Sequence, residues 1–377
     1  MTSEPACGQS AEPETTRIEH GPKQERRQPD PEFWAGRRVV VTGGTGFLGW
    51  HLVQVLRQMR ARFRTLALHP SLRHPILDLD DIEPVFGDVT DSKLVESVLS
   101  DAEIIFHAAG PVAIWGVAPN VILQTHIQGT ANVLRYAPEN AKIVYTSSVT
   151  TIGATRTAIV LDEENSLIPS RLQIPYIEAK REAERLCLEA AKTDRWVVVV
   201  NPGYLIGPDD FGPSILGRIC QRFWKGRVWL VPRGGINVVD VRDVAIGHLL
   251  AVEHGRPGRR YILGGENLSF LQFCYQLSAA AHCRPRFLSA CPAFVLNGCA
   301  AVAHLRSWWT RREPYPSFAQ IQIGTRFWYY TSQRACAELG YSARPISETL
   351  QDTWFWYQQY HRPVLKRFSR WWMRAAA

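Results

Sequence analysis

Tyr176 and Lys180 are the residues of this sequence whose types and spacing best suit proton transfer. They stand four residues apart in a segment with helical spacing, so their side chains lie on one face. A free phenol has a pKa of about 10 and is a poor base at neutral pH, and an ammonium beside it lowers that pKa. The pair is therefore a candidate proton donor and acceptor, although on its own such a pair is more often a solvated helix face.

A glycine-rich turn much earlier in the chain supplies a second candidate site. Gly43, Gly46 and Gly49 follow the apolar run 39–41 and open a segment with apolar residues at helical spacing. Such glycines permit a tight turn, let phosphate oxygens approach the backbone amides and let the helix pack on the strand. Together with the tyrosine–lysine pair, the turn indicates redox chemistry on a nicotinamide cofactor. The residues expected to contact the cofactor here are Gly43, Thr45, Gly46, Phe47, Leu48 and Gly49.

Short apolar runs alternate with helical segments along the first half of the chain. This alternation implies a parallel sheet with helices on both faces. Right-handed crossovers then bring the carboxyl ends of the strands, and the ligand, to one edge of the sheet. The predicted fold class is therefore α/β, a Rossmann-type doubly wound parallel sheet. The expected strands are 38–42, 64–68, 83–86, 103–107, 142–146 and 196–200.

Four further motifs resemble those of one known superfamily: Gly-Asp-Val at 87–89, His-Ala-Ala-Gly at 107–110, Tyr-Thr-Ser-Ser at 145–148 and Asn-Pro-Gly-Tyr-Leu-Ile-Gly-Pro at 201–208. With the glycine turn and the tyrosine–lysine pair, they resemble the extended short-chain dehydrogenase/reductase (NAD-dependent epimerase/dehydratase) superfamily. The chain looks most like the branch that holds dihydroflavonol-4-reductase, 3β-hydroxysteroid dehydrogenase and the hopanoid-associated sugar epimerases. The segments 212–214, 260–268 and 337–341 resemble the last of these.

The resemblance implies a catalytic set of Ser148, Tyr176 and Lys180. In the superfamily the serine hydroxyl holds the substrate oxygen, the tyrosine transfers the proton, and the lysine lowers the tyrosine pKa and binds the nicotinamide ribose. Ser147 is the alternative serine, and Ser148 is favoured because Gly153 follows it at the interval of the family motif. The resemblance also implies that Asp88 accepts from the adenine amino group and that Val89 packs on its ring. Further implied cofactor contacts are Ala108, Ala109, Gly110, Pro202 and Gly203.

The resemblance also implies how the chain is divided. It runs from about residue 36 to about 361 and gives an NAD(P)-binding domain over 36–207, with a return segment at about 236–265. A smaller, interleaved C-terminal substrate-binding lobe is expected over 208–361. Residues 1–35 contain few large apolar side chains, so we expect a disordered tail there. Residues 362–377 form a basic, aromatic tail.

The choice between NAD and NADP depends on the residues after the second strand. NAD enzymes of this fold usually place an acid there for the ribose 2′-hydroxyl, whereas NADP enzymes offer a cation to the 2′-phosphate. No acid follows the strand here, and His69 and Arg73 can donate. A charge-assisted contact contributes about 1.5–3 kcal/mol, so NADP is favoured over NAD. Arg73 as an ordinary surface cation is an equally open interpretation.

Three departures from the superfamily bear on the reaction. Val149 and Thr150 stand where sugar-nucleotide 4,6-dehydratases carry an acidic pair, which disfavours water elimination. Ile236 stands where nucleotide-sugar epimerases place an arginine that grips the pyrophosphate. His126 stands where asparagine is common in the superfamily, which argues against the usual proton-relay water. The alternative is that His126 is a buried core histidine whose ring nitrogens have hydrogen-bond partners.

These features favour an oxidoreductase that interconverts a secondary alcohol and a ketone on an apolar, steroid-, flavonoid- or terpenoid-like substrate. A sugar epimerase with a tightly held cofactor and a non-catalytic dinucleotide-binding protein are the alternatives. Rings in the expected lobe either line an apolar pocket or fill the core. They are Phe211, Phe223, Trp224, Trp229, Trp308, Trp309, Phe327, Trp328 and Tyr329.

Charge and cysteine usage limit the partners. The formal net charge is +8, and residues 1–32 hold seven acidic and four basic side chains, so the excess of positive charge lies in the rest of the chain. This charge suits a dinucleotide phosphate, an acidic substrate or a membrane surface.

The eight cysteines have no C-x-x-C pair and no metal-ligand spacing, which is typical of a cytoplasmic protein with reduced thiols. We therefore expect a small-molecule substrate, no nucleic acid and no metal, and leave open a peripheral membrane contact and a homodimer.

Overall fold

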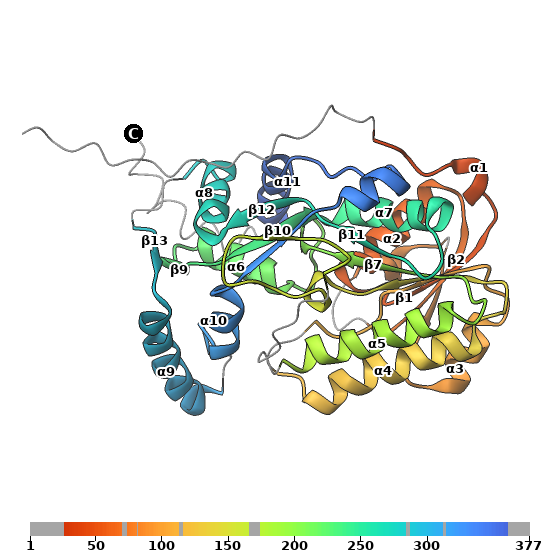
Figure 1. Ribbon diagram of the computed structural model, residues 1–377, viewed down its shortest axis with the longest axis horizontal. Coiled ribbons are helices and arrows are strands. Elements are labelled where there is room, and N and C mark those ends of the chain that lie inside the picture. The colour runs from red at the N-terminus through yellow and green to blue at the C-terminus, as the bar shows by residue number, and fades with distance from the viewer. Residues whose placement is uncertain are drawn as a thin grey trace, which may run out of the picture.

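A computed structural model describes residues 26–69, 74–80, 82–112, 116–165, 174–283, 287–311 and 314–360. Its centre is a seven-stranded sheet with the order β11-β7-β5-β4-β1-β2-β3, in which every neighbouring pair is parallel (Figure 1). This order confirms the predicted Rossmann-type sheet. The strands are β1 (Arg38–Thr42), β2 (Arg62–Ala67), β3 (Glu83–Phe86), β4 (Ile104–His107), β5 (Lys142–Thr146), β7 (Val197–Pro202) and β11 (Arg260–Leu263).

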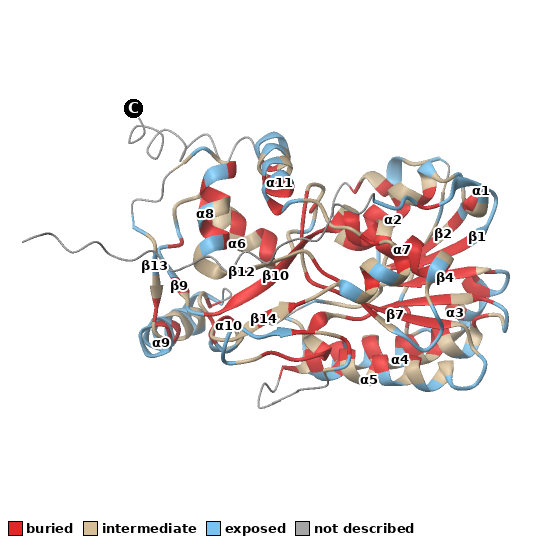
Figure 2. Ribbon diagram, turned by 45° about the horizontal axis from the view of Figure 1, so that its top comes forward, coloured by how far each residue is buried: buried red, intermediate tan, exposed pale blue. Residues whose placement is uncertain are grey.

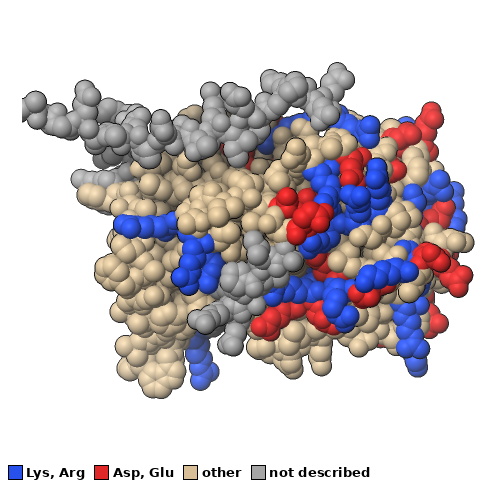
Figure 3. Space-filling view, in the orientation of Figure 1, with Lys and Arg blue, Asp and Glu red and all other residues tan. Residues whose placement is uncertain are grey.

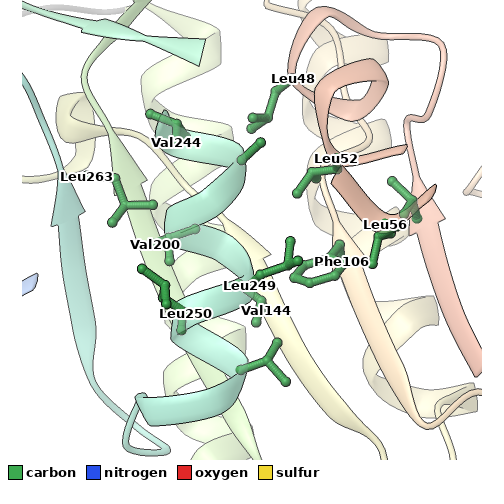
Figure 4. Packing of buried hydrophobic residues seen from close by; sticks show 14 of the residues in the cluster. Leu48, Leu52, Leu56, Phe106, Val144, Val200, Val244, Leu249, Leu250 and Leu263 are labelled. Atoms are coloured by element: carbon green, nitrogen blue, oxygen red, sulfur yellow. The ribbon is translucent and has the colours of Figure 1, made fainter. Parts of the chain in front are cut away.

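Helices cover both faces of this sheet because its central strands are apolar on both sides (Figure 2). On one face Val39 and Val41 pack with α2 and α7, where Leu52 of α2 meets Leu249 of α7 above Phe106 (Figure 4). On the other face Val40 packs with α3, α4 and α5. These helices are α2 (Phe47–Gln58), α7 (Val241–His254), α3 (Ser92–Leu99), α4 (Pro119–Tyr136) and α5 (Pro175–Ala191).

A second sheet with the order β12-β10-β14-β6, in which β8 also pairs with β10, lies beside the first. Within the predicted return segment 236–265, β11 joins the main sheet and α7 packs on α2, whereas β10 belongs to this second sheet. The two predicted parts therefore interleave. The elements here are β6 (Val160–Leu161), β8 (Tyr204–Ile206), β10 (Gly235–Asp240), β12 (Glu266–Ser269), β14 (Phe327–Tyr330), α6 (Ile215–Trp224), α8 (Phe270–Ala280) and α11 (Ile346–Tyr360).

A small outlying unit completes the lobe. The strands β9 (Leu230–Pro232) and β13 (Ser289–Cys291) form a two-stranded parallel sheet. The helices α9 (Ala293–Thr310) and α10 (Phe318–Gly324) pack on one another next to it and project from the end of the molecule that is farthest from β1 (Figure 1). Short helical turns lie at Pro75–Asp78, Val149–Thr151 and Ala335–Leu339.

The prediction of a disordered tail over residues 1–35 is wrong at its end. Residues 31–34 form the helix α1 (Pro31–Trp34), which Asp30 caps by accepting from the Glu32 amide. Trp34 is fully buried, stacks on Phe106 and donates to the Glu253 carboxylate. Burying one large ring offsets the entropy of ordering a short segment. The polar composition of residues 1–35 as a whole does not reveal the effect of this one tryptophan. Residues 1–25 lie outside the described part of the chain.

Candidate active site

The carboxyl ends of β1, β4, β5 and β7 meet at one edge of the main sheet and open on a cavity of about 720 Å³. The lobe, through β8, β10, α6 and α8, forms its other wall. Twelve of the predicted site residues line it, so the fold brings together segments that are far apart in the sequence. They are Gly43, Gly46, Phe47, Leu48, Gly49, Ala108, Gly110, Ser148, Tyr176, Lys180, Pro202 and Gly203.

The glycine turn between β1 and α2 has the shape that a pyrophosphate requires. Gly43 has a φ of 79°, and a Cβ on Gly49 would lie 2.0 Å from the Gly43 carbonyl oxygen, so neither position accepts a side chain. Gly46 is the N-cap of α2 and provides no side-chain cap, which leaves the first amides of the helix for an anion. The residues present therefore fit a dinucleotide.

A buried polar chain that the sequence analysis missed supports the neighbouring loop. The Ala109 amide donates to Thr42 Oγ1 (3.1 Å), which is 2.7 Å from His107 Nδ1. His107 Nε2 is in turn 3.0 Å from Thr130 Oγ1 on α4. Burial, with a contribution from the Lys180 charge, lowers the His107 pKa to about 3, so this imidazole is neutral. The chain fixes the loop after β4, which carries Ala108 and Gly110 to the cavity.

Lys180 is held on the cavity wall by the backbone of β5. Its Nζ donates to the Thr146 carbonyl oxygen at 2.6 Å and lies 5.0 Å from the centre of the Tyr145 ring. The side chain is buried, and burial lowers the Lys180 pKa to about 8 in spite of the nearby Glu184 carboxylate. A lysine with this pKa changes its charge close to physiological pH.

Tyr176 does not show the lowered pKa that the pairing with Lys180 predicted. Burial raises the Tyr176 pKa to about 12, and the hydrogen bond to Ser148 opposes this only in part. The Lys180 ammonium donates to the Thr146 carbonyl oxygen, and desolvation of the phenolate dominates the Tyr176 pKa. In this state Tyr176 is a protonated phenol and thus a proton donor.

The geometry favours Ser148 over Ser147 for contact with a ligand. Ser147 also lines the cavity, but its hydroxyl already donates to the buried Glu184 carboxylate. The Ser148 hydroxyl accepts from the Thr150 amide (3.2 Å) and from Thr150 Oγ1 (3.0 Å), and Ser148 lines the cavity together with Tyr176. Ser148 and Tyr176 therefore border the same cavity.

Glu184 is a second group that the sequence analysis missed. One carboxylate oxygen accepts from Thr151 Oγ1 (2.8 Å) and from Asn201 Nδ2 (2.9 Å), and Asn201 also donates to the Ser148 carbonyl oxygen (3.1 Å). Arg260 pairs with the other oxygen at 3.3 Å. Glu184 therefore fixes the segment that presents Ser148. On α5 it stands one turn after Lys180, where the sequence pattern alone is that of a solvated ion pair.

His126 lies behind Tyr176, with the two ring centroids 5.7 Å apart. Its Nε2 is 3.2 Å from the Pro111 carbonyl oxygen, and its buried Nδ1 has no hydrogen-bond partner among the described residues. Burial, followed by the Lys180 charge, lowers the His126 pKa to about 2, so the ring is neutral. It is therefore a core histidine that is satisfied at one nitrogen only.

The remaining predicted cofactor residues lie around the edge of the sheet. His69 is exposed after β2, with its ring 4.7 Å from that of Phe86, and Thr45 Oγ1 is 3.4 Å from the Leu68 carbonyl oxygen. Asp88 is exposed and accepts from the Thr90 amide and hydroxyl, both at 2.8 Å, as a turn cap does. Val89 is buried against α4. Arg73 lies outside the described residues.

The wall that the lobe contributes is mainly apolar. Ile236 and Val149, which the sequence analysis singled out as departures from the superfamily, both line the cavity. Of the nine rings singled out in the sequence, Trp229 and Trp328 line it, whereas Phe223 and Trp224 are core residues and Trp308 and Trp309 are exposed. Four further rings complete the wall, and they are Tyr204, Phe270, Phe273 and Tyr315.

A signature of the NAD dependent epimerase/dehydratase family matches residues 39–264, more than half of the chain. The chain belongs to this family. Membership confirms the superfamily that the motifs predicted and supports the prediction of an enzyme that uses a nicotinamide cofactor. The glycine turn and the cavity beside it are the places where a cofactor of this kind fits.

Individual family members resemble the chain over most of its length. It is 32% identical over 332 residues to a Synechocystis sp. protein provisionally named dihydroflavonol 4-reductase, covering 85% of this chain and 94% of the relative. It is 27% identical over 328 residues to sterol demethylase protein B of Methylococcus capsulatus, covering 85% and 98%. The crystal structure of gox2253 superposes with a TM-score of 0.73 at 29% identity, covering 87% and 99%.

Proposed function

We propose that this epimerase/dehydratase family member is an NAD(P)-dependent oxidoreductase that interconverts a secondary alcohol and a ketone on an apolar substrate. The observation that carries the proposal is one continuous cavity. It joins the glycine turn, the Ser148, Tyr176 and Lys180 side chains and the apolar wall of the lobe. A nicotinamide bound there supplies the chemistry of hydride exchange.

In the direction of reduction, Tyr176 donates its hydroxyl proton to the substrate oxygen. The Ser148 hydroxyl, which borders the same cavity, holds that oxygen in reach. The phenolate left behind is costly in a buried site, and the Lys180 ammonium offsets part of this cost. A depressed lysine pKa next to a protonated phenol is arranged for proton transfer, and a purely binding protein gains nothing from it.

NADP is the cofactor we favour, with NAD as the alternative. No acidic residue follows β2 between positions 67 and 73, and the exposed His69 stands where a donor would meet a 2′-phosphate. Asp88 and Val89 would bind the adenine. Parallel titrations with NADPH and NADH, followed by nicotinamide fluorescence, test this choice. Tighter binding of NADH would refute it.

An apolar and flat substrate is the class that we propose for the lobe. Tyr204, Phe270 and Trp328 supply rings and Ile236 supplies an aliphatic side chain where a charged clamp would bind a pyrophosphate. The names of two relatives, a dihydroflavonol reductase and a sterol demethylase component, support polycyclic substrates. Following NADPH fluorescence with panels of ketosteroids, flavonoids and terpenoid ketones tests the proposal, which fails if no ketone accelerates NADPH oxidation.

A sugar epimerase is the second candidate, and one observation favours it. Arg218 and Arg227 line the cavity from the side of the lobe, where they would attract an anionic substrate. An epimerase oxidises and reduces its substrate in turn, so it leaves the total of NAD(P)H unchanged, whereas the oxidoreductase consumes it in proportion to product. Stoichiometric cofactor turnover therefore separates the two.

We also propose a peripheral membrane contact and a homodimer for the whole chain. Residues 362–377, on which the first rests, contain five basic and no acidic side chains and two adjacent tryptophans. They lie outside the described residues. Co-sedimentation of the full chain and of a chain ending at residue 361 with anionic vesicles tests the contact. Sedimentation equilibrium tests the dimer.

A further inference from the structure

The helix α9 (Ala293–Thr310) presents large apolar side chains to solvent. Trp308 and Trp309 are 80% and 83% exposed near the end of the helix, and Phe294, its second residue, is 76% exposed. Val302 and Leu305 are also exposed between them. A surface helix normally turns its apolar residues inward, and clustered exposed apolar residues mark an interaction site.

Among the described residues, one side of this helix is buried by packing against neighbouring elements. Leu296 and Ala300 are buried against Cys291 and against Ile321 of α10. Further along, His304 stacks on Phe318 of α10 at 4.9 Å. The remaining sides of α9 point away from the lobe, and the helix projects at the edge of the molecule in both views (Figures 1 and 2).

Among the described residues, the charged side chains on α9 and at its C-terminal end are basic. Between Glu266 and Glu338 the sequence holds seven arginines and one acidic residue, Glu313. Arg306 is exposed on α9 itself, and Arg311 follows the helix. The face that contains α9 is uncharged over most of this region, with isolated basic side chains and with the acidic ones over the main sheet (Figure 3). An apolar surface with a basic fringe complements an anionic bilayer.

The exposed helix also borders the proposed substrate cavity. Leu296 and Cys299 of α9 line the cavity, and so do Trp229 and Leu230, which are themselves largely exposed. The apolar lining therefore continues from the cavity to the surface next to α9. A substrate that dissolves in lipid would pass along this route without crossing water.

We propose that α9 docks on the interface of an anionic lipid bilayer, with Trp308, Trp309 and Phe294 entering the headgroup region, and that the cavity opens toward the lipid. Tryptophan is favoured at that depth. No helix of the described residues is long and apolar enough to cross a membrane, so the contact is interfacial. A second copy of the chain fits the surface less well, because two basic fringes would face one another.

The test uses the whole protein without cofactor or substrate, so its result is independent of the proposed reaction. Flotation with phosphatidylcholine vesicles, with and without phosphatidylglycerol, measures the partition. We expect binding to the anionic vesicles and a loss of roughly tenfold or more when Trp308→Ser is combined with Trp309→Ser. Arg306→Glu should weaken binding roughly fivefold or more on anionic vesicles only. Phe355→Ser, at an exposed ring on the distant α11, is the matched control and should bind as the unaltered protein does.

Two further measurements distinguish docking of α9 on lipid from membrane binding by the C-terminal tail and from pairing with a second copy of the chain. The chain ending at residue 361 should still bind and should still depend on the two tryptophans, because the docking surface lies in α9. Sedimentation velocity without vesicles should give the same mass for the unaltered protein and for the double tryptophan variant. Binding of the chain ending at residue 361 that survives the tryptophan replacements, a loss of all binding when the tail alone is removed, or a dimer that the replacements dissociate would each overturn the proposal.

Discussion

Asp210→Asn should remove a pH dependence of stability that arises in the loop before α6. Asp210 is almost completely buried and accepts from the Ser214 amide with both oxygens, each at 2.9 Å, and from the Tyr357 hydroxyl at 3.1 Å. Burial raises the Asp210 pKa to about 6, and these hydrogen bonds and Arg218 oppose the shift only in part. The carboxyl is therefore protonated more readily in the folded protein than in the unfolded chain.

The sign and size of the effect follow from this shift. Because the folded pKa is above the unfolded value of 3.8, the folded state binds more protons between these pH values. The stabilisation by the bound proton is complete below pH 3.8 and is lost as the pH rises through about 6. A shift of about two pKa units corresponds to about 3 kcal/mol, of which about 2 kcal/mol falls between about pH 4.5 and about pH 7.

Urea unfolding of the wild type and of Asp210→Asn across this range measures the effect. The difference in the free energy of unfolding, variant minus wild type, should become more positive by about 2 kcal/mol from about pH 4.5 to about pH 7. Because all other titratable groups are the same in the two proteins, their contributions to the pH dependence cancel in this difference. Tyr357→Phe removes a donor that lowers the Asp210 pKa, so it should move the midpoint to higher pH. A difference that stays flat with pH would refute the reasoning.

Three predictions concern the proposed reaction. Tyr176→Phe should retain dinucleotide affinity while turnover falls by about 10²–10⁴-fold, whereas Lys180→Ala should lower both; undiminished turnover of the phenylalanine variant would contradict the proton-donor role. The kcat/KM for ketone reduction should fall as the pH rises through about 8, where Lys180 loses the proton that stabilises the phenolate, and a profile without this limb would remove Lys180 from that role. Arg73→Ala should weaken NADPH binding and leave NADH binding almost unchanged; equal losses for both cofactors, or none, would show that Arg73 does not contact the 2′-phosphate.

The sequence by itself determined the parts of the protein that depend on local pattern. The expected strands 38–42, 83–86 and 142–146 have these bounds in the structure, because each is a short run with β-branched or aromatic residues that ends at a turn or loop. The glycine turn was equally readable, since Gly43 adopts a positive φ and Gly49 lies against the Gly43 carbonyl six residues earlier. Family membership followed from the same local motifs.

Tertiary structure alone decided burial, pKa values and the positions of the aromatic rings, because these depend on contacts between segments that are far apart in the sequence. Burial raises the pKa of Tyr176 although Lys180 lies one helical turn away, because desolvation depends on everything packed around the phenol. Glu184 reads as a surface residue in the sequence and is buried by the strands of the sheet. Likewise, Trp328 lines the cavity while Trp308 is exposed, since the position of a ring is set by which elements meet there and not by its own neighbours in the chain.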